Sequence, residues 1–298
     1  MRNRPAMIYV GTCGYAYKDW IGPFYPPRTR TDEMLRFYAR QFRAVEIDMS
    51  YYGIPAATTI ASMNRLTPEN FRFSFKAPQT VTHARDAGSG VHADALLLRE
   101  TIEPLRAAGK LACVLAQFAN RFKPDAESEA YLQRVVEAFE GVPVVAEFRH
   151  RDWQRPRTIE LLRDLGAGYA NVDIPALESL PHASADVTSR IGYVRMHGRN
   201  AAQWWTGTNV TRYAYAYTPQ ELEPWADRIA EIESQAQETY VFFNNHANGR
   251  AARNAEMIEA LLDDRYGEEA QNIIAHAEGG NPEQGLLPGI APPYEDQG

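Results

Sequence analysis

Short apolar runs alternate along the chain with longer amphipathic segments. Eight runs have the length and composition of buried strands, and seven of them are followed by apolar residues at helical spacing. The predicted strands cover residues 8–10, 45–48, 71–75, 111–115, 144–146, 169–172, 193–196 and 240–243. This alternation is typical of an α/β fold and predicts a TIM-type (β/α)8 barrel.

The seven predicted helices begin near Thr31, Ile60, Val91, Ala126, Ile159, Pro219 and Ala251. The sixth strand lacks such a partner, because residues 174–190 hold two prolines and little periodicity. We therefore expect a barrel with a degraded sixth helix. A single barrel domain is predicted over residues 1–267, and the Gly/Pro-rich sequence of residues 268–298 is predicted to form a loosely ordered tail.

Composition narrows the choice of partners. A formal net charge of -7 argues against a broad basic surface, so we expect neither nucleic acid nor an anionic membrane as a partner. The two cysteines, Cys13 and Cys113, form no disulfide framework, which favours a cytoplasmic location. No segment approaches the roughly 20 apolar residues of a membrane span.

Polar side chains follow nearly every predicted strand. The densest group closes the fifth strand, where Val144 and Val145 give way to Glu147, Arg149 and His150. Because the carboxyl ends of barrel strands meet at one mouth, these side chains should converge there. The remaining members of the set are Glu46, Asp48, Lys76, Gln117, Asn171, Asp173, Arg195, His197, Asn244, Asn245 and His246.

Several motifs resemble those of the YecE-like family (domain of unknown function 72). They are residues 11–15 with Trp20, 45–47, 73–78, 117–118, 147–150 with Trp153, 195–198 and 243–245. The resemblance runs in order from residue 8 to residue 262 and implies a barrel fold, but no established reaction. The chain departs from the family pattern at Asp48, where the family usually has Asn, and at residues 119–120, which replace Pro-Pro.

Three groups of side chains are candidates for chemistry at the mouth. Glu46 and Glu147 have the character of a general acid and base, with His197 as a possible acid, and the alternative is structural pairing with nearby cations. Arg149, Arg195 and Lys76 suit the capture of an anion. Amide hydrogen bonding and stacking on the ligand are predicted for Gln117, Asn244, Asn245, Trp153 and Tyr15.

We therefore predict a hydrolase-type enzyme that binds a small anionic or polyhydroxylated ligand, with no cofactor and no metal. One alternative is a metal-dependent phosphodiesterase or endonuclease-like hydrolase, in which His150, His197 and His246 act with Glu46, Glu147 or Asp173. No HxH or HExxH spacing supports it. The other alternative is a non-catalytic ligand-binding or regulatory module.

Overall fold

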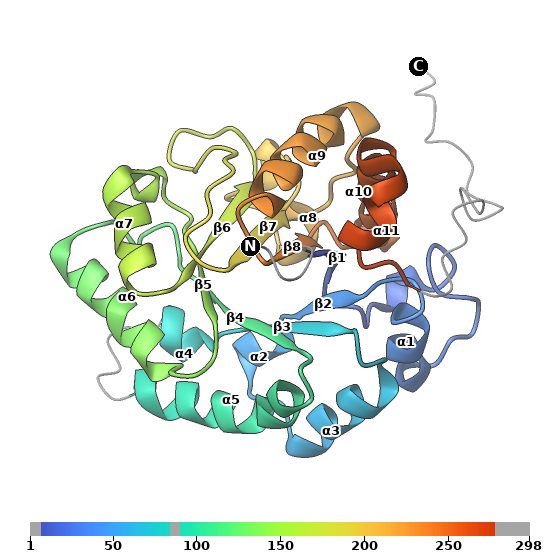
Figure 1. The fold of residues 1–298 in the computed structure, drawn as a ribbon, viewed down its shortest axis with the longest axis horizontal. Coiled ribbons are helices and arrows are strands. Elements are labelled where there is room, and N and C mark those ends of the chain that lie inside the picture. The colour runs from blue at the N-terminus through green and yellow to red at the C-terminus, as the bar shows by residue number, and fades with distance from the viewer. Residues whose placement is uncertain (1–6, 84–89, 278–298) are drawn as a thin grey trace.

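Eight parallel strands close into a barrel in chain order (Figure 1). The computed structural model describes residues 7–83 and 90–277. Each strand pairs in parallel with the next, and β8 pairs with β1. The strands are β1 Met7–Cys13, β2 Ala44–Ile47, β3 Arg72–Lys76, β4 Leu111–Gln117, β5 Val144–Glu147, β6 Gly168–Asp173, β7 Ile191–Met196 and β8 Glu238–Phe243. The predicted TIM-type barrel is confirmed.

Helices surround the barrel after seven of the eight strands (Figure 1). They are α1 Thr31–Tyr38, α3 Ala57–Leu66, α5 Gly90–Ala107, α6 Ala126–Ala138, α7 Pro156–Asp164, α9 Pro219–Glu233 and α10 Arg250–Tyr266. Residues 174–190, which connect β6 to β7, contain no helix, as the two prolines predict. None of the described helices combines the length and the apolar character needed to cross a membrane.

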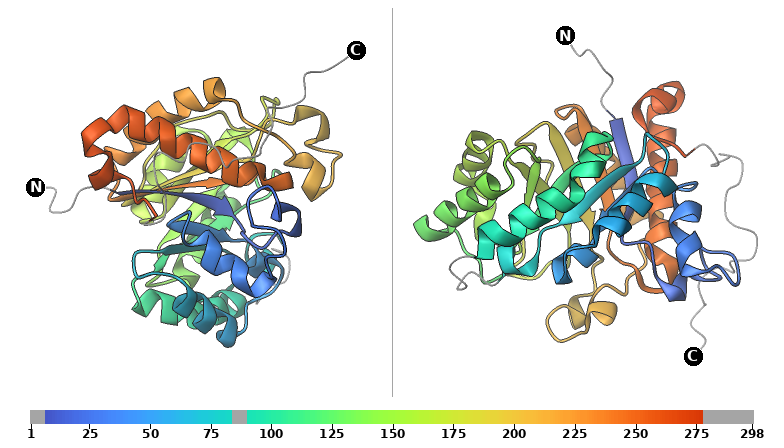
Figure 2. Two further views of the ribbon diagram at one scale, coloured as in Figure 1. Left: turned by 90° about the vertical axis from the view of Figure 1, so that its right-hand side faces the viewer. Right: turned by 90° about the horizontal axis from the view of Figure 1, so that it is seen from below.

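One-turn helices follow several strands at the carboxyl end of the barrel. They are η1 Lys18–Trp20, α2 Met49–Tyr52, α4 Gln79–Thr82, η2 Arg151–Trp153, η3 Ala201–Gln203, α8 Asn209–Arg212 and η4 Ala247–Gly249. The segment between β7 and α9, predicted as a long loop, contains two of them. This segment projects beyond the barrel at the end opposite the start of β1 (gold in Figure 2).

Strand alternation sorts the side chains into two apolar layers. On β1, Ile8 and Val10 pack in the large cluster between barrel and helices, whereas Tyr9 packs in a second cluster inside the barrel. Tyr9 stacks on Tyr240 inside, with ring centroids 5.2 Å apart, and Tyr193 lies beside Tyr240. Aromatic rings thus fill the barrel interior below the polar strand ends.

The first strand is longer than predicted. The predicted strand covers residues 8–10, whereas β1 begins at Met7 and continues through Cys13. Gly11 is required there by a close approach of β2, since a Cβ atom at Gly11 would lie 2.0 Å from the carbonyl oxygen of Ala44. The turn begins at Gly14, which has a positive φ of 74°.

The folded chain also extends further than the predicted domain boundary. Residues 268–277 were assigned to the loosely ordered tail, but η5 Gly267–Glu269 and α11 Ala270–Ile273 follow α10 directly. The Ala275 N–H then donates to the Ile8 carbonyl at 2.9 Å. Ala270 and Ile274 are buried, so apolar contacts hold this segment against the barrel. The remaining tail, residues 278–298, lies outside the described residues.

Candidate active site at the barrel mouth

A cavity of about 640 Å³ opens at the carboxyl ends of the strands. Side chains from the segments that follow all eight strands line it. This volume falls within the ~300–1,000 Å³ typical of small-molecule sites. The predicted ligand site therefore coincides with a cavity at the expected end of the barrel.

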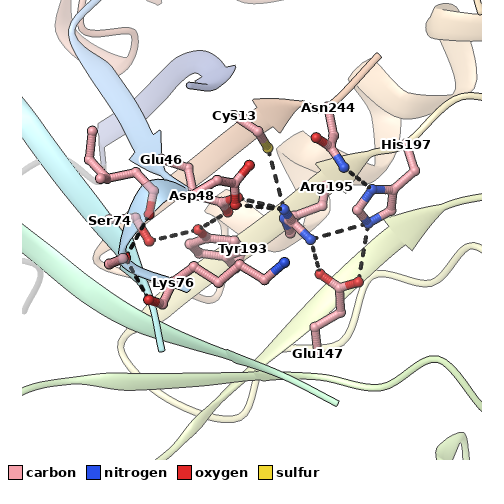
Figure 3. A network of polar contacts seen from close by, with 12 residues as sticks. Cys13, Glu46, Asp48, Ser74, Lys76, Glu147, Tyr193, Arg195, His197 and Asn244 are labelled. Atoms are coloured by element: carbon pink, nitrogen blue, oxygen red, sulfur yellow. Dashed lines mark hydrogen bonds and ion pairs between the residues drawn. The ribbon is translucent and has the colours of Figure 1, made fainter. Parts of the chain in front are cut away.

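Glu46, Glu147, Arg195 and His197 form a buried ionic network behind the cavity lining, which we call the floor; Figure 3 shows its contacts. Arg195 on β7 is 1% exposed and lies between two carboxylates. Its Nη1 donates to Glu147 Oε2 at 2.5 Å, and its Nη2 donates to Glu46 Oε1 at 2.5 Å. Because the three residues come from β7, β5 and β2, the network connects strands across the barrel interior.

Glu147 is the most heavily paired carboxylate of the network. It accepts hydrogen bonds from Arg149 Nε and Arg195, and its Oε1 lies 3.2 Å from His197 Nε2. Burial alone would raise the pKa of Glu147, but Arg149, Arg195 and His197 outweigh burial and hold the pKa well below its usual range. Glu147 is therefore ionised, and both of its carboxylate oxygens are engaged within the network.

Glu46 has a different environment. Tyr193 donates its hydroxyl proton to Glu46 Oε2 at 2.6 Å, and Ser74 lies 2.8 Å from the same Tyr193 oxygen. Burial raises the pKa of Glu46 and outweighs the opposing effect of Arg195, while Asp48 raises it further. The two glutamates thus differ in protonation behaviour, as acid and base pairs do. Neither glutamate lines the cavity, because both are fully buried.

His197 connects the floor to the cavity wall. Its Nδ1 accepts a hydrogen bond from the Asn244 amide at 2.9 Å, so Nε2 carries the ring proton and donates to Glu147. Burial and the charge of Arg149 lower the pKa of His197 well below its usual range, so the ring is neutral. His197 is fully buried, whereas Asn244 lines the cavity. The histidine positions the amide and Glu147 without reaching the cavity itself.

The cavity wall is rich in cations. Lys76, Arg149 and Arg212 line it, and Asp48 is the one carboxylate among the described lining residues. Lys76 Nζ lies 4.4 Å from the centroid of the Tyr51 ring, and no carboxylate of the described chain lies within salt-bridge distance of it. The wall therefore carries net positive charge although the whole chain is acidic.

The pKa of His83 indicates the same positive electrostatic potential in the cavity. It lines the cavity, and burial together with Lys76, Arg121 and Arg149 lowers its pKa to about 4. Cations that disfavour a protonated histidine favour a bound anion for the same electrostatic reason.

Tyr213 is a site residue that was not predicted from the sequence. It lines the cavity 5.8 Å from the His197 ring. Burial would raise the pKa of its phenol, but Arg149, Lys76 and Arg195 outweigh burial and lower it. The sequence signal was the group of aromatic residues between β7 and α9, which does not distinguish Tyr213 from its neighbours.

Arg195, predicted to capture an anion, does not line the cavity, because its guanidinium is buried between Glu46 and Glu147. Three further residues predicted to contact the ligand do not line the cavity either. Trp153 is fully buried, stacks on Phe148 at 4.3 Å and donates its indole N–H to the Phe122 carbonyl at 2.7 Å. Asn245 points away from the barrel axis and donates to the Tyr215 carbonyl at 2.9 Å. Those side chains therefore stabilise the packing behind the mouth.

The third is Tyr15, which does not line the cavity; its ring packs 6.0 Å from that of Tyr38. Gln117 and Asn244, also predicted to contact the ligand, line the cavity. Asp173 faces outward, where it accepts hydrogen bonds from Arg199 and Trp225.

The histidines considered as metal ligands do not converge. His150 faces Asp152 at 3.4 Å, His197 is buried in the floor, and His246 stacks on Tyr17 in the wall. A different group, Cys13 with Glu46 and Asp48, has donor atoms within 4.8 Å of one another.

This second group does not fit a metal ion either, because Arg195 occupies the space between the donors. The Arg195 Nη2 lies 2.5 Å from Glu46, 3.5 Å from Cys13 Sγ and 3.9 Å from Asp48. A cation there would face the guanidinium charge directly. Burial and Glu46 also raise the pKa of the Cys13 thiol, which disfavours the thiolate that binds metal.

The sequence of this barrel matches one family model over residues 9–277, described as "Protein of unknown function DUF72". The chain belongs to the DUF72 family. The resemblance to YecE-like proteins is thereby confirmed, and the matched residues include every described strand end that lines the mouth.

One sequence relative and two solved structures match most of this DUF72 chain. The UPF0759 protein YunF of Bacillus subtilis is 33% identical over 274 residues, covering 87% of this chain and 96% of YunF. A DUF72 family protein of Thermotoga maritima has a solved structure with a TM-score of 0.81 and 35% identity, covering 86% of this chain and 99% of that one. A DUF72 family protein of Enterococcus faecalis gives a TM-score of 0.77 and 28% identity, with 86% and 96% covered.

Proposed function

We propose that the barrel mouth binds a small anion, such as a phosphate or carboxylate group, and that the protein is a hydrolase-type enzyme acting on that ligand. The observation that carries the proposal is the charge of the lining. Among the described lining residues Lys76, Arg149 and Arg212 are cations and Asp48 is the one carboxylate; Glu147 balances the charge of Arg149, so Lys76 and Arg212 leave the wall with an excess of positive charge. Cations in a partly desolvated cavity bind anions far more strongly than they do in water.

Arg149 has the geometry of an anion anchor. Glu147 accepts a hydrogen bond from its Nε, so the guanidinium is held in place before a ligand arrives. The same group lies 5.6 Å from the ring of Trp204. Its Nη1 has no hydrogen-bond partner among the described residues and is available to a ligand in the cavity. A preorganised donor loses little entropy on binding.

Hydrolysis requires groups that exchange protons at the cavity wall. Glu46, Glu147 and His197 were predicted for this role, but all three are fully buried in the floor and act as positioning residues. Asp48 and Tyr213 reach the cavity. In the proposed reaction, Asp48 takes a proton from the attacking water and Tyr213 gives a proton to the leaving group.

Calorimetric titration with inorganic phosphate tests the binding step. Lys76→Met and Arg212→Gln should each weaken binding by about ten- to hundredfold, the worth of one charge-assisted hydrogen bond. Arg157→Gln is the matched control, because Arg157 lies exposed on α7 away from the cavity. Affinity that is equal in all three variants, or absent from the unmodified protein, would contradict the proposal.

Turnover of a panel of phosphate and carboxylate esters tests the hydrolase step. Asp48→Asn and Tyr213→Phe should remove turnover while phosphate still binds. Phosphate binding without hydrolysis of any ester in the panel would support the non-catalytic binding module instead.

A further inference from the structure

We propose that the ligand joins an anionic group through a sugar to a planar aromatic ring and belongs to the nucleoside monophosphate class. This inference rests on the anion-binding function proposed above. It concerns the part of the ligand that does not contact the basic side chains. Three features of the mouth support it: its size, the placement of its aromatic residues, and the exposure of two of them.

The cavity is much larger than a single tetrahedral anion requires. Its volume of about 640 Å³ suits a ligand of drug or cofactor size. Lys76 and Arg149 account for one part of the wall only, so most of the ligand must contact other residues.

Part of the aromatic lining lies apart from Lys76 and Arg149. The rings of Tyr51 and Trp204 lie against these two cations, at 4.4 and 5.6 Å, so other aromatic residues remain for the rest of the ligand. Lys76 and Arg149 follow β3 and β5. Tyr17 and Trp205 follow β1 and β7, which lie opposite β5 and β3 in the closed barrel and form the aromatic side of the mouth. Tyr52 follows β2, which pairs with both β1 and β3 and so adjoins this side. A ligand that spans the mouth would therefore place its anion toward β3–β5 and its other end among aromatic rings.

A flat surface lies in the middle of the aromatic side. The rings of Tyr17 and His246 stack with centroids 4.8 Å apart and an interplanar angle of 1°. Both side chains line the cavity, and they come from the segments after β1 and β8. The Tyr17 ring also packs against Trp20, at 4.9 Å, so the His246 ring and the edge of the stack are the parts on which another planar ring can pack.

Two large aromatic side chains lie exposed on either side of this stack. Tyr52 on α2 is 68% exposed and Trp205 between η3 and α8 is 54% exposed, although both belong to the cavity lining. Aromatic residues at the rim of a charged site are the common means by which proteins hold a base, because every base has a π-face. Stacking on the base of a ligand would thus explain why the apolar side chains of Tyr52 and Trp205 are exposed at this rim.

Titration with three probes tests the inference: adenosine 5′-monophosphate, ribose 5-phosphate and adenosine. The monophosphate should bind about ten- to hundredfold more tightly than ribose 5-phosphate, because it adds the stacked ring. It should also quench tryptophan fluorescence, whereas ribose 5-phosphate should not. Trp205→Ala and Tyr52→Ala should each reduce the difference between the two phosphates and leave the affinity for ribose 5-phosphate unchanged.

Val210→Ala is the matched control, because Val210 is a 56% exposed apolar residue of the same segment that does not line the cavity. Equal binding of the monophosphate and ribose 5-phosphate would overturn the inference about the ring and leave anion binding intact. Adenosine that binds as tightly as the monophosphate would overturn anion binding instead. Failure of all three probes to bind would overturn both.

Discussion

Replacement of Glu147 by glutamine tests whether the buried floor is held together by charge. The change keeps the volume of the side chain and creates no cavity, but it removes the carboxylate shared by Arg149, Arg195 and His197. Two buried guanidinium groups then lose a counter-charge. Loss of one partner of a buried ion pair costs about 3–5 kcal/mol, and we expect a decrease of this size in the free energy of unfolding.

Urea denaturation at pH 7 measures the effect, with Asp227→Asn as the control. Asp227 pairs with Arg265 at the surface, where its side chain is 68% exposed, so its loss should cost about 0.2–1 kcal/mol. Costs of similar size for the two variants would refute the view that Glu147 neutralises a buried cationic pair.

The cost of the Glu147 substitution should also depend on pH. The folded state holds the pKa of Glu147 well below its usual range, so the carboxylate stabilises the fold above the unfolded pKa of about 4.3. That contribution is lost as the pH falls toward the folded pKa. The difference between the unmodified and Glu147→Gln proteins should therefore shrink as the pH decreases below about 5, and a difference that stays constant from neutral to acid pH would contradict the assignment.

Three further changes probe other parts of the structure. Gly11→Ala should prevent soluble folding, because its Cβ would overlap the Ala44 carbonyl, whereas Gly53→Ala, with open space around it, should fold normally in the same expression test. Trp153→Phe should lower the free energy of unfolding by about 1–3 kcal/mol in urea. The same substitution should leave phosphate affinity unchanged. A large loss of affinity would indicate that Trp153 contacts the ligand after all. In NMR titrations the pKa of His83, about 4 in the free protein, should rise when sulfate binds; no movement would place the anion elsewhere.

The fold was predictable because it depends on repeated local patterns. Buried strands and amphipathic helices repeat their signals seven times, and the prolines of residues 174–190 mark the interruption. Helices of one turn, such as α2 and α8, are too short to show a period. The extent of β1 was missed for another reason, since the need for Gly11 arises from the distant Ala44 carbonyl.

The sequence predicted that the site lies at the carboxyl ends of the strands, but not which side chains there face the cavity. Asn244 and Asn245 have the same chemistry, yet strand alternation places the first in the cavity and the second behind it. A strict count of alternate positions along β8 would have separated them. The place of Tyr213 was not accessible in this way, because it depends on how the segment between β7 and α9 lies over the mouth. The burial of Trp153 likewise depends on Phe122, which is distant in the chain.

The binding of an anion by the cationic wall is most directly tested by a crystal structure of the protein grown with inorganic phosphate. We expect density for the anion within hydrogen-bond distance of Lys76 Nζ and the Arg149 guanidinium, with the Glu147 and Arg195 pairing unchanged. A metal ion bound by Cys13, Glu46 and Asp48, or phosphate bound only outside the mouth, would contradict the account.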